Sequence, residues 1–161
     1  MTKVVGIVGW KDVGKTFFVT KIINLLVKKG YKVGTIKHAH HDFDIDKPGT
    51  DSFKHRQSGA SEVIISSSKR WAKIIENNNK TEKKLNELLR EFNDVDLVIV
   101  EGFKKENHPK IEIISKNLKI INNEIKNVVA IVTDHKIDSN IPLFSRNDVE
   151  SLAEFIIDNF L

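Results

Sequence analysis

The segment GWKDVGKT, residues 9–16, lies between an apolar run and a helical pattern, and it constrains the fold more than any other feature. The spacing from Gly9 through Gly14 to Lys15 and Thr16 fits G-x-x-x-x-G-K-[ST], a loop whose backbone N–H groups wrap the phosphates of a nucleotide. The preceding run, KVVGIV, is rich in β-branched side chains, which is typical of a parallel strand buried on both faces. The order of strand, loop and helix predicts a phosphate-binding loop, or P-loop.

The residues after this loop predict a helix. Apolar side chains recur there at helical spacing, and Gly30 stands where the helix is expected to stop. At its start, Lys15 is expected to reach the β- and γ-phosphates, and Thr16 to offer its hydroxyl to Mg²⁺. The predicted nucleotide-binding residues are therefore Gly9, Trp10, Lys11, Asp12, Val13, Gly14, Lys15, Thr16 and Phe17.

The rest of the chain alternates predicted strands with predicted helices. Strands are expected within residues 31–38, 62–68, 71–77, 96–103, 110–114 and 128–134. Helices are expected within residues 51–58, 85–92 and 149–160. The second and third of these strands face each other across a tight turn at Lys69 and Arg70, which predicts a hairpin. The pattern indicates an α/β fold of the P-loop NTPase class, with a mixed, mostly parallel sheet flanked by helices, as a single nucleotide-binding domain over residues 1–161.

Composition limits the compartment and the partners that we expect. The chain has no cysteine, which excludes disulfides and thiolate metal sites and fits a reducing compartment. The first core strand begins at the amino terminus, and no apolar run approaches the length that spans a membrane, so we expect a cytoplasmic protein without a membrane partner. A formal net charge of +4 suits polyanionic ligands but is too mild to require nucleic acid.

Two carboxylates end predicted strands, at the edge of the sheet where ligands bind in open α/β folds. Glu101 ends DLVIVE, and a carboxylate there is expected to hold the metal or its waters beside Thr16. Asp134 ends VVAIVTD. Two roles are open for its carboxylate. It could accept hydrogen bonds from the N1–H and amino group of guanine, or it could be an ordinary turn residue.

The segment HAHHDFDID, residues 38–46, combines histidines with carboxylates. Such side chains suit a divalent metal, yet the segment has no i, i+4 histidine pair on a predicted helix. A polar loop that becomes ordered when ligand arrives fits equally well. Arg56, on the short helix that follows, is a candidate for meeting phosphates or only a surface residue.

Together the segments GWKDVGKT, TIKHAHHDFDIDKPGTDSFKHRQSGA and DLVIVEGFK, followed by HPKIEI, resemble the molybdopterin-guanine dinucleotide biosynthesis protein B family. The resemblance covers nearly the whole chain, and HDFDIDKPGTDS is far more specific than the P-loop. It departs from the family at Trp10, Lys11 and Asp12, where relatives often have small residues.

The resemblance implies a cytoplasmic homodimer that binds GTP and Mg²⁺, hydrolyses GTP slowly and helps a partner molybdopterin guanylyltransferase to attach GMP to molybdopterin. It implies catalytic roles for Lys15 and Glu101, with Thr16 and Glu101 at the metal. The family-specific surface would comprise His41, Asp42, Asp44, Asp46, Pro48, Gly49, Asp51, Ser52 and Arg56. The predicted hairpin, residues 62–77, is the candidate dimer interface.

Two other functions fit the same residues. A GTP-dependent metallochaperone would use the histidine cluster at His38, His40 and His41. A small-molecule P-loop kinase would use residues 38–56 as its acceptor pocket, although no arginine-rich lid is evident in the sequence. A nucleic-acid motor is disfavoured, because the chain is small and lacks a basic stripe interleaved with aromatic residues.

Overall fold

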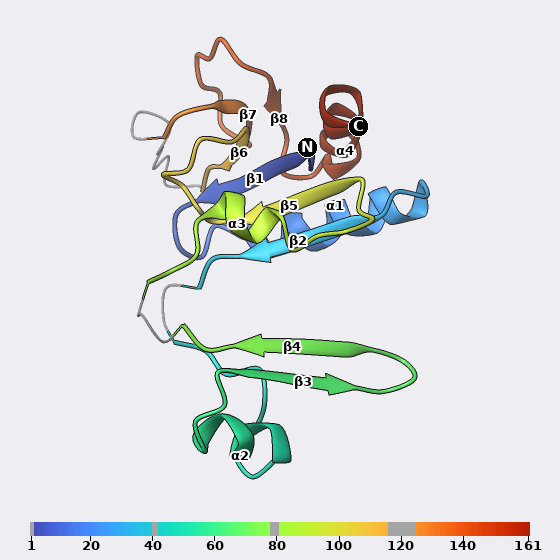
Figure 1. Ribbon diagram of the computed structural model, residues 1–161. Helices are drawn as coiled ribbons and strands as arrows, with labels where there is room; N and C mark the ends of the chain where they lie inside the picture. The colour runs from blue at the N-terminus through green and yellow to red at the C-terminus, as the bar shows by residue number, and fades with distance from the viewer. Residues whose placement is uncertain (1, 40–41, 78–80, 116–124) are drawn as a thin grey trace. The chain divides into compact units, whose positions relative to one another are not determined.

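The computed structural model describes residues 2–39, 42–77, 81–115 and 125–161. The helices, labelled in Figure 1, are α1 (Lys15–Lys28), α2 (Asp51–Gln57), α3 (Leu85–Leu89) and α4 (Val149–Phe160). The strands are β1 (Val4–Gly9), β2 (Val33–Lys37), β3 (Glu62–Ser66), β4 (Trp71–Ile75), β5 (Leu97–Glu101), β6 (Lys110–Ile113), β7 (Val128–Val132) and β8 (Leu143–Phe144). In the described ranges, no helix is long and apolar enough to cross a membrane.

Six strands form one sheet in the order β2-β5-β1-β6-β7-β8, and each described pairing in it is parallel. The predicted α/β class, with a mostly parallel sheet flanked by helices, is confirmed. The hairpin β3–β4 pairs antiparallel in a sheet of its own. The short connection from Glu101 to Lys110 carries the chain past β1 to its other side, where β6 also pairs parallel with β1.

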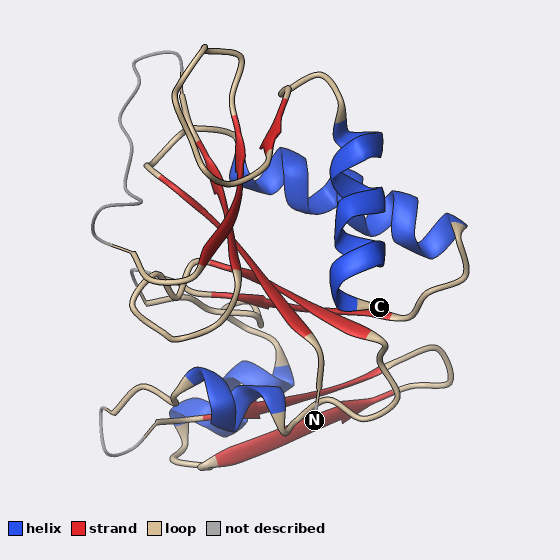
Figure 2. Ribbon diagram, turned by 90° about the horizontal axis from the view of Figure 1, so that it is seen from above, coloured by secondary structure: helices blue, strands red, loops and turns tan. Residues whose placement is uncertain are grey.

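Helices cover both faces of the six-stranded sheet. Side chains of α1 and α4 pack on one face, and Figure 2 shows α4, which ends at the C label, crossing the longer α1. On α1 the residues that pack inward recur at helical spacing and include Phe18, Ile22 and Leu26, none more than 1% exposed. Burying each of them contributes about 1.5–3 kcal/mol. Leu85 of α3 packs on Val98 and Val100 at the opposite face.

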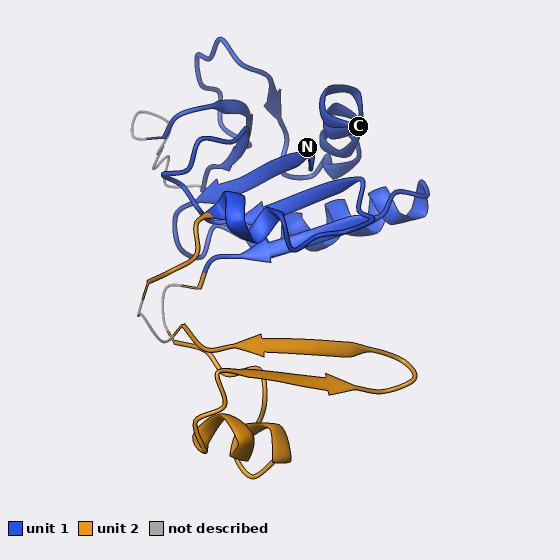
Figure 3. Cartoon of the chain, in the orientation of Figure 1, with its two compact units in different colours: residues 1–38, 85–161 blue, residues 39–84 orange. Residues whose placement is uncertain are grey.

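The chain divides into two compact units, coloured separately in Figure 3. Residues 1–38 and 85–161 form the first unit, which contains the six-stranded sheet, and residues 39–84 form the second, with α2 and the hairpin. The hairpin turn closes through a hydrogen bond from the Ser67 N–H to the Arg70 carbonyl at 2.9 Å, as predicted. The prediction of one domain over the whole chain stays a prediction.

Most predicted elements are confirmed, with two differences at their margins. The helix expected to reach Phe92 ends at Leu89, and the Phe92 side chain packs instead against the same cluster as Leu85. Strand β8 was not predicted, because two residues carry too little periodicity to be recognised in a sequence.

Candidate functional site

The loop between β1 and α1 has the close approaches and backbone angles of a phosphate-binding loop. A Cβ on Gly9 would lie 2.6 Å from the Ile113 carbonyl oxygen and 2.8 Å from Val13 Cγ2, so only glycine fits there. Gly14, the N-cap of α1, has a φ of 90°, which also favours glycine. The loop thus presents the amino end of α1, whose unpaired N–H groups and positive dipole end suit an anion.

Lys15 lies along this loop. Its Nζ donates to the carbonyl of Trp10 at 2.7 Å and to that of Gly9 at 3.4 Å. Burial lowers the pKa of Lys15, and the ammonium of Lys104 lowers it further. The predicted phosphate-binding lysine is therefore in place at the loop.

Thr16 and Glu101 meet as the sequence predicted. The Thr16 hydroxyl lies 3.2 Å from both carboxylate oxygens of Glu101, which is 13% exposed. The strands on both sides fix this carboxylate, since Glu101 is in register with Ile7 of β1 and Lys37 of β2, and Lys37 Nζ is 3.6 Å from its Oε1. A hydroxyl and a carboxylate are the hard oxygen donors that Mg²⁺ prefers, so this pair fits that ion.

Arg146 holds the P-loop through hydrogen bonds, a role that the sequence did not reveal. Its Nη2 donates to the Val13 carbonyl at 2.8 Å, and its Nη1 donates to the Ile114 carbonyl at 2.9 Å. The guanidinium carbon lies 5.4 Å from the ring centroid of Phe18 on α1. Arg146 precedes α4 in a polar turn without a recognised motif, so no local signal points to it.

Asp134 follows β7, as predicted, and one of its oxygens is engaged by the chain itself. Oδ1 accepts hydrogen bonds from the Arg146 backbone N–H at 2.9 Å and from the Ser145 hydroxyl at 3.1 Å. The backbone hydrogen bond from Arg146 is the main cause that lowers the pKa of Asp134. These contacts hold Asp134 in the turn and join it through Arg146 to the P-loop, and its role as a guanine reader stays a prediction.

Lys104 also faces the loop and was missed in the sequence. Its Nζ lies 5.4 Å from the ring centroid of Trp10, a cation–π arrangement. It ends the segment DLVIVEGFK that carries the family resemblance, but one lysine among many has no signal of its own.

The predicted family-specific residues fall in the second unit, apart from His41, which lies outside the described residues. The structure places Asp42, Asp44, Asp46, Pro48 and Gly49 in the segment before α2, Asp51 and Ser52 in its first turn, and Arg56 near its end. Whether they surround a nucleotide stays a prediction.

Arg56 is not available as a free phosphate-binding group. Its Nη2 donates to Asp46 at 2.6 Å and to Asp44 at 2.7 Å, while its Nη1 donates to Glu76 at 2.6 Å. The side chains of Arg56 and Asp46 are 10% and 4% exposed, and the hydrogen bond from Arg56 lowers the pKa of Asp46. The surface reading is therefore wrong as well, because Arg56 is the hub of an ion-pair network that folds the segment onto α2 and β4.

The described residues include no group of three or more His, Cys, Asp or Glu side chains suited to a metal ion. Of the predicted histidine cluster, His40 and His41 lie outside the described part of the chain. His38 stacks on Phe103, with ring centroids 4.5 Å apart.

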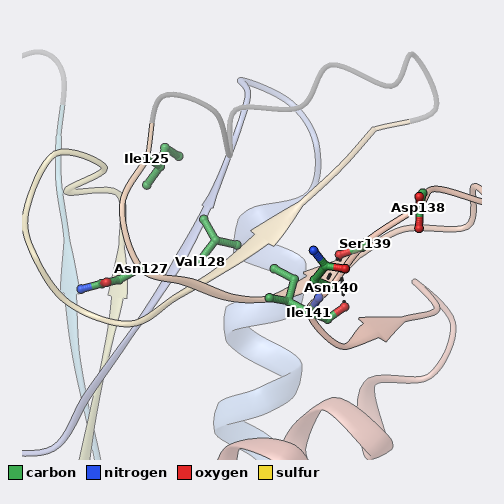
Figure 4. Close-up of a pocket in the computed structure, with 7 residues that line it drawn as sticks. All are labelled: Ile125, Asn127, Val128, Asp138, Ser139, Asn140 and Ile141. Carbon is green, nitrogen blue, oxygen red and sulfur yellow. Dashed lines mark hydrogen bonds between the residues drawn. The ribbon is translucent and has the colours of Figure 1, made fainter.

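A separate hollow of about 490 Å³ lies away from the P-loop (Figure 4). Val128, which lines this hollow, begins β7, whereas Gly9 ends the parallel strand β1. The hollow therefore lies at the amino ends of the strands, and the P-loop lies at their carboxyl ends. The lining is mostly polar and consists of Ile125, Asn127, Val128, Asp138, Ser139, Asn140 and Ile141.

The parallel sheet, the glycine-bounded loop and the Thr16–Glu101 pair define a P-loop α/β protein. Comparison with known proteins gives the family. The chain belongs to the family described as molybdopterin guanine dinucleotide synthesis protein B, which matches residues 4–134.

Individual relatives agree over almost the full length. The molybdopterin-guanine dinucleotide biosynthesis adapter protein of Escherichia coli strain K12 is 35% identical over 163 residues, covering 98% of this chain and 93% of that protein. The protein of the same name from Haemophilus influenzae is 35% identical over 159 residues, covering 97% and 88%. A crystal structure of molybdopterin-guanine biosynthesis protein B, 29% identical, superposes with a TM-score of 0.80 and covers 96% of this chain and 98% of that one. The crystal structure of Bacillus subtilis MobB, 24% identical, shares the fold with the same TM-score over 99% of this chain and 98% of its own.

Proposed function

We propose that this protein is a GTP-binding adapter that assists a partner guanylyltransferase in forming molybdopterin-guanine dinucleotide in the cytoplasm. The observation that carries the proposal is the Thr16 hydroxyl at 3.2 Å from both oxygens of Glu101, beside Lys15 on the P-loop. Family membership and the names of the relatives support the pathway.

Each residue of the site has a distinct task in this proposal. The backbone N–H groups of the loop and the Lys15 ammonium would bind the phosphate oxygens. Thr16 and Glu101 would hold Mg²⁺ or its waters, and the ion would neutralise charge on the β- and γ-phosphates. Lys15 and Glu101 thus supply charge neutralisation and metal positioning, which is most of what phosphoryl transfer asks of a protein.

Turnover by the isolated protein should be slow. Fast GTP hydrolysis needs a group that positions water and a cation that stabilises the transition state. The two arginines considered above are committed elsewhere, Arg56 to three carboxylates and Arg146 to two loop carbonyls. The hydrolysis rate therefore depends on what a partner adds.

Asp134 is the proposed guanine reader. Oδ1 already accepts from Arg146 and Ser145, which fixes the orientation of the carboxylate. A carboxylate oxygen has two lone pairs, so Oδ2 retains capacity for the N1–H and amino donors of guanine, a donor pair that adenine lacks.

The hairpin supports the proposed homodimer. Its side chains Ile64 and Trp71 are 64% and 69% exposed, and a two-stranded hairpin is marginal without a surface to pack on. A second copy of the chain would cover these apolar side chains. Light scattering that finds a strict monomer at micromolar concentration contradicts the dimer. A Trp71→Asp variant should dissociate while a Lys69→Asp variant, changed at the turn, should not.

Calorimetric titration with GTP, ATP and GDP in Mg²⁺ tests the nucleotide proposal. We expect GTP to bind with much higher affinity than ATP, because guanine has the paired N1–H and amino donors that Asp134 would accept and adenine does not. Equal affinity or a preference for ATP contradicts the guanine assignment and favours the kinase alternative. Absence of any nucleotide binding contradicts the P-loop assignment itself.

A further inference from the structure

Two ammonium groups converge on one residue of the P-loop. Lys15 Nζ donates to the Trp10 carbonyl at 2.7 Å, and Lys104 Nζ lies 5.4 Å from the centroid of the Trp10 ring. Lys104 is close enough that its charge contributes to lowering the pKa of Lys15. Two ammonium groups beside one residue repel each other, and an anion bound between them would relieve this repulsion.

The backbone that delivers Lys104 to this place is strained. Directly after Glu101, Gly102 and Phe103 have φ values of 100° and 50°, and a left-handed conformation at a residue other than glycine costs on the order of 1 kcal/mol. Tertiary contacts hold the turn, because Phe103 is 8% exposed and stacks on His38, and the Gly102 N–H donates to the Ile7 carbonyl at 3.3 Å. This backbone conformation turns the chain sharply after Glu101 and places the Lys104 ammonium over the ring of Trp10.

We propose that Lys104 is a second phosphate-binding lysine, which donates to the terminal phosphate of a bound nucleoside triphosphate. Its place supports this assignment, because Lys104 follows Glu101 by three residues at the end of β5, and a metal held by Glu101 would neutralise charge on the same phosphates. The site then distinguishes a triphosphate from a diphosphate. This inference deepens the proposed function and rests on nucleotide binding at the P-loop.

Trp10 gives the proposal an optical readout. When Lys104 moves from the indole ring to a phosphate oxygen, the ring loses its cation, and its fluorescence should change. The chain has two tryptophans, and the other is Trp71 of the hairpin. A Trp71→Phe background therefore leaves Trp10 as the sole reporter.

The test compares three variants in that background, titrated with GTP and with GDP in Mg²⁺. Because a hydrogen bond to a charged group contributes about 1.5–3 kcal/mol, Lys104→Ala should weaken GTP binding roughly 10- to 100-fold and GDP binding by less than about threefold. Lys105→Ala removes the same charge from the neighbouring exposed residue and should change neither affinity. Lys104→Arg should restore part of the GTP preference.

The outcomes separate the two proposals. Equal loss of GTP and GDP affinity in Lys104→Ala, or no loss, overturns the role of Lys104 while nucleotide binding stands. A difference between the GTP-induced and the GDP-induced change of Trp10 fluorescence that persists unaltered in Lys104→Ala also overturns it. If the unsubstituted protein binds neither nucleotide, the P-loop assignment fails and this inference fails with it.

Discussion

Arg146 donates from Nη2 to the Val13 carbonyl at 2.8 Å, and this hydrogen bond ties the segment before α4 to the middle of the P-loop. Val13 is 4% exposed, so its carbonyl lies where water has little access. Arg146 also donates its backbone N–H to the carboxylate of Asp134, the proposed guanine reader. Arg146 thus joins the proposed phosphate and base ends of the site.

Replacing Arg146 by methionine should loosen the loop. We expect a loss of about 1–3 kcal/mol in the free energy of unfolding, because the carbonyls of Val13 and Ile114 lose their donors. GTP affinity should fall several-fold, since the loop must then be ordered on binding. Thermal unfolding and calorimetric titration measure the two effects. Arg90→Met, at an exposed position, is the control, and unchanged GTP affinity in Arg146→Met contradicts the coupling.

Replacing Lys15 by alanine should weaken triphosphate binding at least about tenfold, because a charge-assisted contact to phosphate is lost. The fold should persist, since the ammonium donates to the carbonyls of Gly9 and Trp10 and not to the buried core. Circular dichroism checks the fold and calorimetry the affinity. Lys21→Ala on the same helix is the matched control. Full GTP affinity in Lys15→Ala removes the basis for the P-loop assignment.

Replacing Thr16 by valine should abolish the contribution of Mg²⁺ to binding. The change removes the hydroxyl that faces Glu101 and keeps the shape of the side chain. We expect similar GTP affinity with Mg²⁺ and with a chelator in Thr16→Val, but a clear difference in the unsubstituted protein. Thr20→Val, one turn further along α1, should retain the difference. If Thr16→Val keeps its full response to Mg²⁺, the metal assignment is wrong.

The P-loop and Glu101 could be predicted because their signals are local. A motif of fixed spacing between a β-branched strand and a helix restricts its own geometry, and Glu101 ends an apolar strand whose position in a parallel sheet follows from the fold class. Arg146 and Lys104 could not be predicted, because their contacts join residues far apart in the sequence. Arg146 has no motif, and Lys104 ends DLVIVEGFK, a segment that indicates the family without assigning a contact to the lysine.

Arg56 shows that the burial of a charged side chain is difficult to predict from a sequence. A basic residue in a polar segment suggests an exposed side chain, whereas the carboxylates of Asp44, Asp46 and Glu76 surround it. The sequence shows these carboxylates, but the return of β4 to α2 that brings Glu76 to the arginine is a tertiary event. The burial of an ion pair follows from packing, which no local pattern records.

Replacing Arg56 by methionine should destabilise the second unit. The change leaves the Asp46 carboxylate, which is 4% exposed, without its cation, and this loss destabilises the segment that the network holds. Hydrogen exchange of residues 42–77 should become faster than in the unsubstituted protein, because loss of the network favours local opening. Arg70→Met in the hairpin turn should have little effect. Unaltered exchange in Arg56→Met contradicts the structural role of the network.

His108 should make stability depend on pH. It is 4% exposed, and burial, with a smaller effect of Lys110, lowers the pKa of His108 to about 4 from 6.5. Between these pH values the unfolded chain binds more protons than the folded one, so the free energy of unfolding should fall as pH decreases from about 6.5 to about 4. The loss should be no more than about 3–4 kcal/mol, because one pKa unit corresponds to about 1.4 kcal/mol.

Denaturant unfolding at several pH values measures this dependence. His108→Phe should remove that part of the slope, whereas His55→Gln, at an exposed position of α2, should leave it unchanged. An equal slope in His108→Phe and the unsubstituted protein shows that other groups are responsible.

The contact between Thr16 and Glu101 joins residues 85 positions apart in the chain. During synthesis the ribosome therefore releases the P-loop long before the carboxylate that completes the proposed metal pair. Until β5 has inserted beside β1, the nascent chain has a phosphate loop without its acidic partner, and such a chain should bind Mg²⁺ and nucleotide weakly. A ligand that binds only the finished sheet stabilises it by mass action, so nucleotide supply in the cell would favour completely folded molecules over partly folded ones.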